Sequence, residues 1–201
     1  MGVAHIVLIK IVSVKKMSKT LCIDTETGGL NPYKSALCSV TIKVVGEDKI
    51  KTIYIKPTKN REYNSDAMRI NNLNLQELNK KGVTEKEAVE QITQFIKKYG
   101  GFKPIFLAHN IIFDAQFLNV LFYRTKKIMF TDLMHYHPID TMIIMKVLKQ
   151  SGQININSIS LSSCYKYFFN KKINGAHTSE GDVLATEQIY NEINKKFKTI
   201  K

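Results

Sequence analysis

Two acidic residues stand two positions apart, directly after a short apolar run near the start of the chain. The run covers residues 21–23, and Asp24 and Glu26 follow it. Alternate side chains of a strand share one face, so both carboxylates can point to one spot. Neighbouring carboxylates repel each other and are costly to bury together unless a cation lies between them. A strand that simply ends in a polar turn at Gly28-Gly29 explains the same residues, so the pair alone leaves both interpretations open.

Two more acids and a histidine stand where helices are expected to begin. Asp114 falls in the first turn of one helix, and Asp182 lies near the start of the last helix, with His177 shortly before it. A structural explanation exists for each acid. Asp114 would interact favourably with the helix dipole in a helix that Asn110 could cap, and Ser179 with Asp182 fits a capping box. Together with Asp24 and Glu26, these two acids give four carboxylates, and such oxygen donors suit Mg²⁺ or Mn²⁺ rather than zinc. A nearby histidine suits proton transfer near neutral pH. Because open α/β sheets collect ligands at the ends of strands, the sequence predicts that these residues meet there.

Three segments carry these residues, and together they resemble the three exonuclease motifs of the DnaQ-like (DEDDh) 3′–5′ exonucleases. They are residues 24–30 (DTETGGL), 109–114 (HNIIFD) and 177–182 (HTSEGD), and they occur in the order found in that family. The resemblance runs from about residue 20 to residue 190, which is most of the chain. In the third segment four residues separate the histidine from the aspartate, as in the histidine branch of the family.

The resemblance implies a ribonuclease H-like fold and a two-metal mechanism. Two Mg²⁺ or Mn²⁺ ions, roughly 4 Å apart, would be held by four acids: Asp24, Glu26, Asp114 and Asp182. His177 would act as the general base that takes a proton from the attacking water, and hydrolysis of the terminal phosphodiester would release nucleoside 5′-monophosphates. Substrate contacts are implied for five residues: Thr25, Thr27, Leu30, Asn110 and Phe113. For Leu30 and Phe113, packing in the core is the alternative.

The resemblance favours the single-stranded 3′ end of DNA as the substrate, in a proofreading or repair role with a DNA polymerase as a candidate partner. This preference rests on residues 24–32 and on the pairing of Asn110 with Phe113, which look like the proofreading branch. One alternative is an RNA-directed exonuclease of the same family, similar to oligoribonuclease or a tRNA-trimming enzyme, because contacts to the 2′-hydroxyl cannot be identified in a sequence. The other is a catalytically silent nucleic-acid-binding or polymerase-associated domain.

The composition favours a polyanionic partner such as nucleic acid. In 201 residues, 30 Lys and Arg stand against 17 Asp and Glu, which gives a net charge of +13. Since 27 of these cations are Lys and only three are Arg, a solvated lysine surface explains part of the excess, and reading of guanine edges by Arg is disfavoured. Three widely spaced Cys form neither a disulfide framework nor a zinc pattern, which favours a reducing, cytoplasmic location. No run of about 18 apolar residues occurs, so no membrane-spanning helix is expected.

The segments that must position these residues alternate between strand and helix patterns. Strands are predicted over residues 20–24, 36–45, 50–55, 104–108 and 138–139, and helices over 65–81, 84–99, 113–123, 140–149, 160–169 and from 179 onward. Residues 46–49 mark a hairpin, and Thr84 with Glu87 forms a capping box. A strand meander followed by alternating helices and strands predicts one α/β domain over residues 17–201, a mixed sheet of antiparallel and parallel strands flanked by helices. Residues 1–16 are expected to be an N-terminal extension, either native or upstream of a start at Met17.

Overall fold

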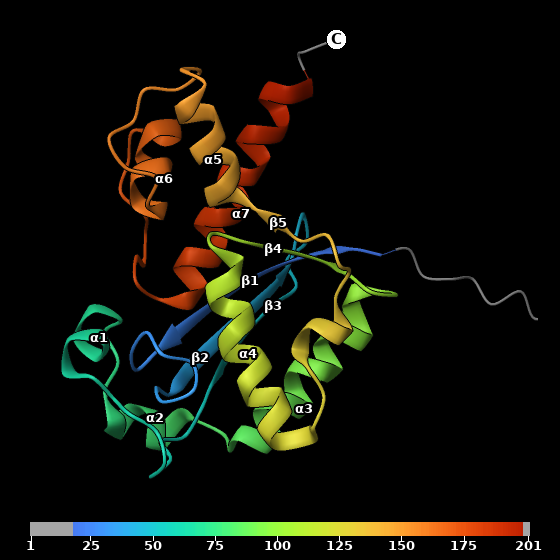
Figure 1. The fold of residues 1–201 in the computed structure, drawn as a ribbon, viewed down its shortest axis with the longest axis vertical. Helices are drawn as coiled ribbons and strands as arrows, with labels where there is room; N and C mark the ends of the chain where they lie inside the picture. The colour runs from blue at the N-terminus through green and yellow to red at the C-terminus, as the bar shows by residue number, and fades with distance from the viewer. Residues whose placement is uncertain (1–17, 199–201) are drawn as a thin grey trace, which may run out of the picture.

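A mixed sheet of five strands lies at the centre of the computed structural model, which describes residues 18–198. The strands are β1 (Thr20–Thr27), β2 (Leu37–Val44), β3 (Ile50–Tyr54), β4 (Ile105–Ala108) and β5 (Ile139–Asp140), in the spatial order β3-β2-β1-β4-β5 (Figure 1). The first three form an antiparallel meander, whereas β4 is parallel to β1 and β5 is parallel to β4. This confirms the α/β mixed sheet predicted from the sequence. The expected extension at residues 1–16 lies outside the described residues.

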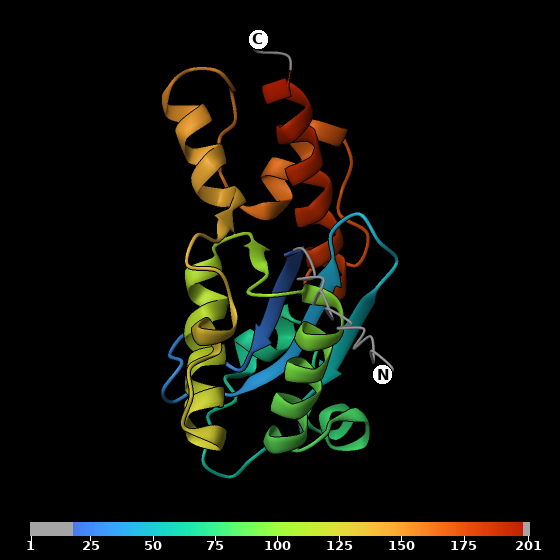
Figure 2. The same ribbon diagram turned by 90° about the vertical axis from the view of Figure 1, so that its right-hand side faces the viewer.

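Helices flank the sheet on both faces. They are α1 (Ser65–Ile70), α2 (Leu75–Lys81), α3 (Glu85–Phe95), α4 (Ile111–Lys126), α5 (Thr141–Gln150), α6 (Leu161–Phe169) and α7 (Ser179–Lys198), with a π-turn η1 (Ile96–Gly100) and a 3₁₀ turn η2 (Phe130–Leu133). Helices α5 and α6 pack with the second half of α7 into a separate apolar cluster at one end of the molecule (Figures 1 and 2). Within residues 18–198 no helix is both long and apolar enough to cross a membrane.

The sheet has two different faces, because side chains alternate along β1 and β2. The apolar face packs against α3 and α4 and forms the main core, with Leu21, Ile23, Val40 and Ile42 from these two strands. The other face lies under α7, where Cys22 contacts the helix at Val183. The acidic residues of β1 are on this second face, so the fold directs them toward the start of α7.

Strand β1 is longer than predicted, because its ladder with β2 continues through the acidic residues. Asp24 pairs with Thr41 and Glu26 pairs with Ser39, and the register shifts only between Glu26 and Thr27. The predicted strand, which ended at Asp24, was therefore too short. The continued pairing gives both acids a rigid backbone.

Two local predictions are confirmed. In the capping box at the start of α3, the Thr84 hydroxyl accepts from the Glu87 backbone at 3.3 Å and the Glu87 carboxylate accepts from the Thr84 backbone at 2.8 Å. In the hairpin between β2 and β3, the Val44 backbone N–H donates to the Lys49 carbonyl at 2.8 Å. Gly46 has a φ of 77° in this turn, a conformation that side chains disfavour.

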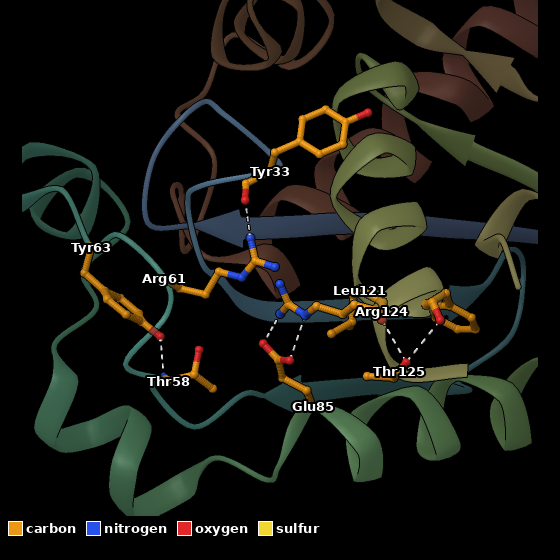
Figure 3. A network of polar contacts seen from close by, with 9 residues as sticks. Tyr33, Thr58, Arg61, Tyr63, Glu85, Leu121, Arg124 and Thr125 are labelled. Carbon is orange, nitrogen blue, oxygen red and sulfur yellow. Dashed lines mark hydrogen bonds and ion pairs between the residues drawn. The ribbon is translucent and has the colours of Figure 1, made fainter. Parts of the chain in front are cut away.

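Two arginine contacts brace the elements around the loop that follows β1 (Figure 3). Arg124 on α4 forms a two-pronged ion pair with Glu85 on α3, in which Nε donates to Oε2 at 2.8 Å. Arg61 donates to the backbone carbonyl of Tyr33 in the loop. The first contact holds α3 against α4, and the second fixes the loop that leads from β1 to β2.

Candidate active site

Three carboxylates meet near the carboxyl end of β1. Asp24 and Glu26 are alternate residues of the strand and share one face, and Asp182 lies in the first turn of α7, which packs over that face. One oxygen atom from each side chain lies within 4.8 Å of the other two. A group of oxygen donors this close together can bind a divalent cation.

Asp114 is buried beside this group, in the first turn of α4. Its side chain is 3% exposed, and the Thr25 hydroxyl donates to Oδ1 at 2.7 Å. The charge of Asp114 is close enough to raise the pKa of both Asp24 and Glu26. The structure thus brings all four predicted acids into one electrostatic group, with Asp114 outside the three that share the 4.8 Å spacing.

Burial and mutual repulsion disfavour four negative charges at this place. Burial is the largest cause and raises the pKa of Glu26 to about 8, that of Asp114 to about 7 and that of Asp182 to about 6. Burial also raises the pKa of Asp24, and the charge of Asp114 adds to the effect. Within the described part of the chain, no salt bridge joins any of these acids to Lys or Arg. The donor set therefore fits Mg²⁺ or Mn²⁺, which would supply the missing positive charge.

His177 lies on the loop that leads into α7, and its side chain is exposed. Its φ is 61°, in the left-handed region that few residues other than glycine adopt. The charge of His177 and a hydrogen bond from its backbone N–H both lower the pKa of Asp182, against the larger effect of burial. The predicted base therefore adjoins the acidic group on its solvent-exposed side.

The start of α4 is held by Asp140 and not by Asn110, which corrects the predicted cap. Asn110 has a φ of 75°, and its side chain makes no capping hydrogen bond. The Asp140 carboxylate instead accepts from the backbone N–H groups of Asn110 and Ile111, both at 3.0 Å. It also accepts from Met142 at 2.9 Å, at the start of α5. One carboxylate therefore fixes the starts of two helices, of which α4 carries Asp114.

The predicted capping box of Ser179 with Asp182 is absent from the described start of α7. The Ser179 hydroxyl is buried and forms hydrogen bonds with Thr41 at 2.8 Å and Ser39 at 3.2 Å. The Thr178 hydroxyl takes the capping role, because it accepts from a backbone N–H in the first turn of α7 at 3.1 Å. Sequence reasoning missed the Ser179 contacts because a serine near a helix start ordinarily caps it.

Three of the predicted substrate contacts lie at or near the surface. Leu30 is 85% exposed, which excludes core packing as its role. Phe113 is half-buried and packs against the main core, with its ring centroid 5.0 Å from that of Phe117. Asn110 is also half-buried. Leu30 is thus free to touch a ligand, whereas only part of the Phe113 side chain is accessible.

The two predicted threonine contacts are buried. The Thr25 hydroxyl is engaged with Asp114, and the Thr27 hydroxyl donates to the carbonyl of Gly29 at 2.7 Å. Both hydroxyls therefore support the site from within, and any contact of these residues with substrate stays a prediction.

A cavity of about 430 Å³ opens next to Glu26, between the segment of α1 and α2 and the start of α7. Asn71 and Asn72 line it on one side and Thr178 on the other. The Asn71 side chain also donates to the backbone carbonyl of Thr27 at 3.0 Å, which ties the cavity wall to β1. Its volume falls in the range of small-ligand pockets. No sequence pattern indicated it, because it is enclosed by segments that are far apart in the chain.

The chain resembles known nucleases in sequence. A family model named RNase_T and described as "Exonuclease" matches residues 21–190. Ribonuclease T of Buchnera aphidicola subsp. Baizongia pistaciae is 24% identical, with 94% of this chain and 90% of that protein covered. Ribonuclease T of Blochmanniella pennsylvanica is 24% identical, with 89% of this chain and 85% of that protein covered.

The fold resembles that of a solved nuclease. Escherichia coli exonuclease I in complex with a dT13 oligonucleotide matches with a TM-score of 0.71 and 22% identity, over 88% of this chain and 41% of that one. The zinc-bound form of its complex with single-stranded DNA matches with a TM-score of 0.74 and 22% identity, over 90% and 41% of the two chains. This chain thus spans about two fifths of the exonuclease I chain, and at this identity the likeness is one of fold.

Proposed function

The chain belongs to this exonuclease family, of the DnaQ 3′–5′ type that its motifs resemble, and we propose that it removes nucleoside 5′-monophosphates from single-stranded 3′ ends with the help of divalent cations. The observation that carries the proposal is the meeting of Asp24, Glu26 and Asp182 within 4.8 Å, beside the buried Asp114. A catalytically silent binding domain would not need to keep four acids in so unfavourable an arrangement.

In the proposed site the four acids would hold two Mg²⁺ or Mn²⁺ ions. Once bound, such ions offset negative charge on the phosphodiester and make a water molecule a better nucleophile. His177 would accept a proton from the attacking water on a ring nitrogen, and its exposure would allow the proton to pass on to solvent. Thr25 orients Asp114 through the hydrogen bond at 2.7 Å.

The terminal nucleotide is proposed to bind between the loop after β1 and the start of α4. Leu30 contacts the base with its exposed side chain, and Phe113 contacts it with the part of its side chain that the core leaves accessible. Asn110 is available for polar contacts, since its side chain does not cap α4. Thr25 and Thr27 are assigned to the same nucleotide site through their backbone groups, because both hydroxyls are engaged within the protein.

The names of the sequence relatives favour RNA as the substrate of this chain. The two sequence relatives described above are named ribonuclease T and match this chain over 85–90% of their own length. We therefore place an RNA 3′ end first, ahead of the DNA preferred from the sequence. DNA is the second candidate, because the fold neighbour exonuclease I was solved with a dT13 oligonucleotide. None of these proteins is named as a polymerase subunit, so the proofreading role and the polymerase partner are not part of the proposal.

Two further parts of the proposal concern the whole chain. We assign the catalytic function to a single domain over residues 17–201. A cytoplasmic location is proposed because Cys22, Cys38 and Cys164 are all free and buried, as expected under reducing conditions.

Matched single-stranded RNA and DNA oligonucleotides with a 5′ label test this proposal. With Mg²⁺ or Mn²⁺ the label should appear on products shortened one nucleotide at a time from the 3′ end, faster on RNA, and EDTA should stop the reaction. Asp24→Ala should abolish it, because the group of acids loses a central member. The exposed hairpin residue Asp48 provides the control, since Asp48→Ala removes an acid away from the site and should leave the rate unchanged. Degradation by Asp24→Ala protein at the wild-type rate would refute the assignment.

A further inference from the structure

The face of β2 that lies under α7 is polar although it is buried. Ser39, Thr41 and Lys43 alternate along this face and are between 0% and 8% exposed. Burial of polar groups is costly unless each has a partner. All three find partners on α7, while the intervening residues of β2 face the apolar core.

The first contact lies at the start of α7, next to the acids. The Ser179 hydroxyl is placed between Thr41 at 2.8 Å and Ser39 at 3.2 Å. These two residues are the direct cross-strand partners of Asp24 and Glu26. The hydroxyl of Thr41 also bonds that of a β3 threonine at 2.9 Å, so the hydroxyl cluster extends from α7 across β2 to β3.

The second contact lies two helical turns further along α7. The Glu187 carboxylate accepts from Lys43 Nζ at 2.7 and 3.0 Å and from the Gly46 backbone at 2.6 Å. Lys43 also donates to the carbonyl of Glu47 at 2.7 Å. This buried ion pair ties the helix to the hairpin end of β2.

Asp182 lies between these two contacts on the same helix. Ser179 and Glu187 are eight residues apart, which corresponds to about 12 Å along a helix at ~1.5 Å per residue. Apolar contacts such as that of Val183 are non-directional, so they allow a helix to slide over a sheet, whereas hydrogen bonds fix its position. We propose that the Ser179 hydroxyl cluster and the Glu187–Lys43 pair set the position of α7 along β2 and thereby hold Asp182 at metal-binding distance from Asp24 and Glu26. Thr41, Ser179, Lys43 and Glu187 are thus positioning residues. The inference rests on the metal site of the proposed function.

A pair of Thr41 variants tests the first contact. Thr41→Val removes the hydroxyl and keeps the branched shape, whereas Thr41→Ser keeps the hydroxyl. The readout is the Mg²⁺ concentration that gives half of the Mg²⁺-induced rise in melting temperature. We expect about a tenfold increase for Thr41→Val, as for other residues that support metal ligands, and a value within about twofold of wild type for Thr41→Ser. Thr93→Val is the matched control, because it removes a half-buried threonine hydroxyl from α3, on the other side of the sheet.

Glu187→Gln tests the second contact. Glu187 lies more than one helical turn beyond Asp182 on α7. An increase in the half-effective Mg²⁺ concentration would therefore support an effect that acts through the position of the helix. If Thr41→Val does not fold, Ser179→Ala removes a single oxygen atom from the same cluster and should give the same increase. The inference is overturned if the folded variants respond to Mg²⁺ as wild type does, or if Thr41→Ser is impaired as much as Thr41→Val.

Nuclease assays on the same samples separate this inference from the proposed function. Absence of 3′-end degradation by the wild-type protein, together with the expected pattern of Mg²⁺ responses, would refute the proposed function and leave the inference standing. An active wild-type enzyme whose variants all bind Mg²⁺ normally would refute the inference alone.

Discussion

At the scale of single residues, the buried acids couple the stability of the protein to pH. Burial raises the pKa of Asp182 to about 6, that of Asp114 to about 7 and that of Glu26 to about 8, whereas the ordinary values are 3.8 for Asp and 4.5 for Glu. At pH values between the ordinary and the raised pKa values, these acids therefore hold their protons more tightly in the folded protein than in the unfolded chain. By linkage, the contribution of these acids to the free energy of unfolding is greatest at pH values below their ordinary pKa values and decreases as pH rises through the raised ones.

We predict that in EDTA the melting temperature falls as pH rises from about 5 to about 8. Saturating Mg²⁺ should reduce this fall, because a bound cation favours the charged carboxylates. Glu26→Gln serves as the comparison, since it removes an acid whose pKa is raised to about 8 and should flatten the profile measured in EDTA. A metal-free melting temperature that stays constant or rises over this interval would contradict the electrostatic description of the site.

His177 is predicted to affect the chemical step rather than metal binding. Its backbone is left-handed at φ 61°, so His177→Asn is a better variant than His177→Ala, because Asn tolerates this conformation. We expect kcat to fall by about 10²-fold or more, as for loss of a general base, with little change in the Mg²⁺ dependence of the melting temperature. His137→Asn, at an exposed histidine on the loop before β5, should leave kcat unchanged. Loss of Mg²⁺ binding by His177→Asn would show that the assigned role is wrong.

The four acids and the histidine could be selected as candidate site residues from the sequence, because three motifs carry them in a fixed order along the chain. The partners of the acids could not be predicted in the same way. Nothing in the sequence around Thr25 indicates that its hydroxyl contacts Asp114 on α4. The position of Ser179 near a helix start predicts a cap, whereas its hydroxyl contacts two hydroxyls of β2. Such contacts depend on which elements pack together, which local sequence does not encode.

At the scale of elements, a single carboxylate caps the starts of both α4 and α5. Asp140 accepts from Asn110 and Ile111 on one side and from Met142 on the other. The sequence pattern indicated a short strand ending at residue 139 and a helix starting at 140, which is close to what is observed. It did not indicate that the same side chain also caps a helix 30 residues earlier, because that contact follows from the parallel pairing of β4 and β5.

We predict that Asp140→Ala lowers the free energy of unfolding by about 2–4 kcal/mol, since two helix caps of about 1 kcal/mol each are lost and backbone N–H groups are left without acceptors. Chemical denaturation measures this change. Asn74→Ala is the matched control, because Asn74 caps only α2, and it should cost about 1 kcal/mol. Asp140→Ala should also slow the nuclease, because α4 carries Asp114, whereas Asn74→Ala should not. Equal losses of stability in the two variants would contradict the double-cap role.

At the scale of the whole molecule, the fold converts three distant segments into one site. The antiparallel meander places two acids on a rigid strand, the parallel strand β4 leads into α4 with the third, and α7 crosses the polar face with the fourth. The mixed sheet could be predicted from the order of strand and helix patterns. The cavity beside Glu26 could not, because its walls come from the turn between α1 and α2, from α2 and from the start of α7, which approach one another only after folding.

The proposed metal site is best tested by a crystal structure of the protein with Mn²⁺ and a nucleoside 5′-monophosphate, with anomalous data to locate the metal. We expect anomalous peaks among the carboxylates of Asp24, Glu26, Asp114 and Asp182, with the phosphate bound to the same ions. A structure in which Mn²⁺ binds elsewhere, or in which one of these acids turns away from the others when the nucleotide is bound, would contradict the proposed site.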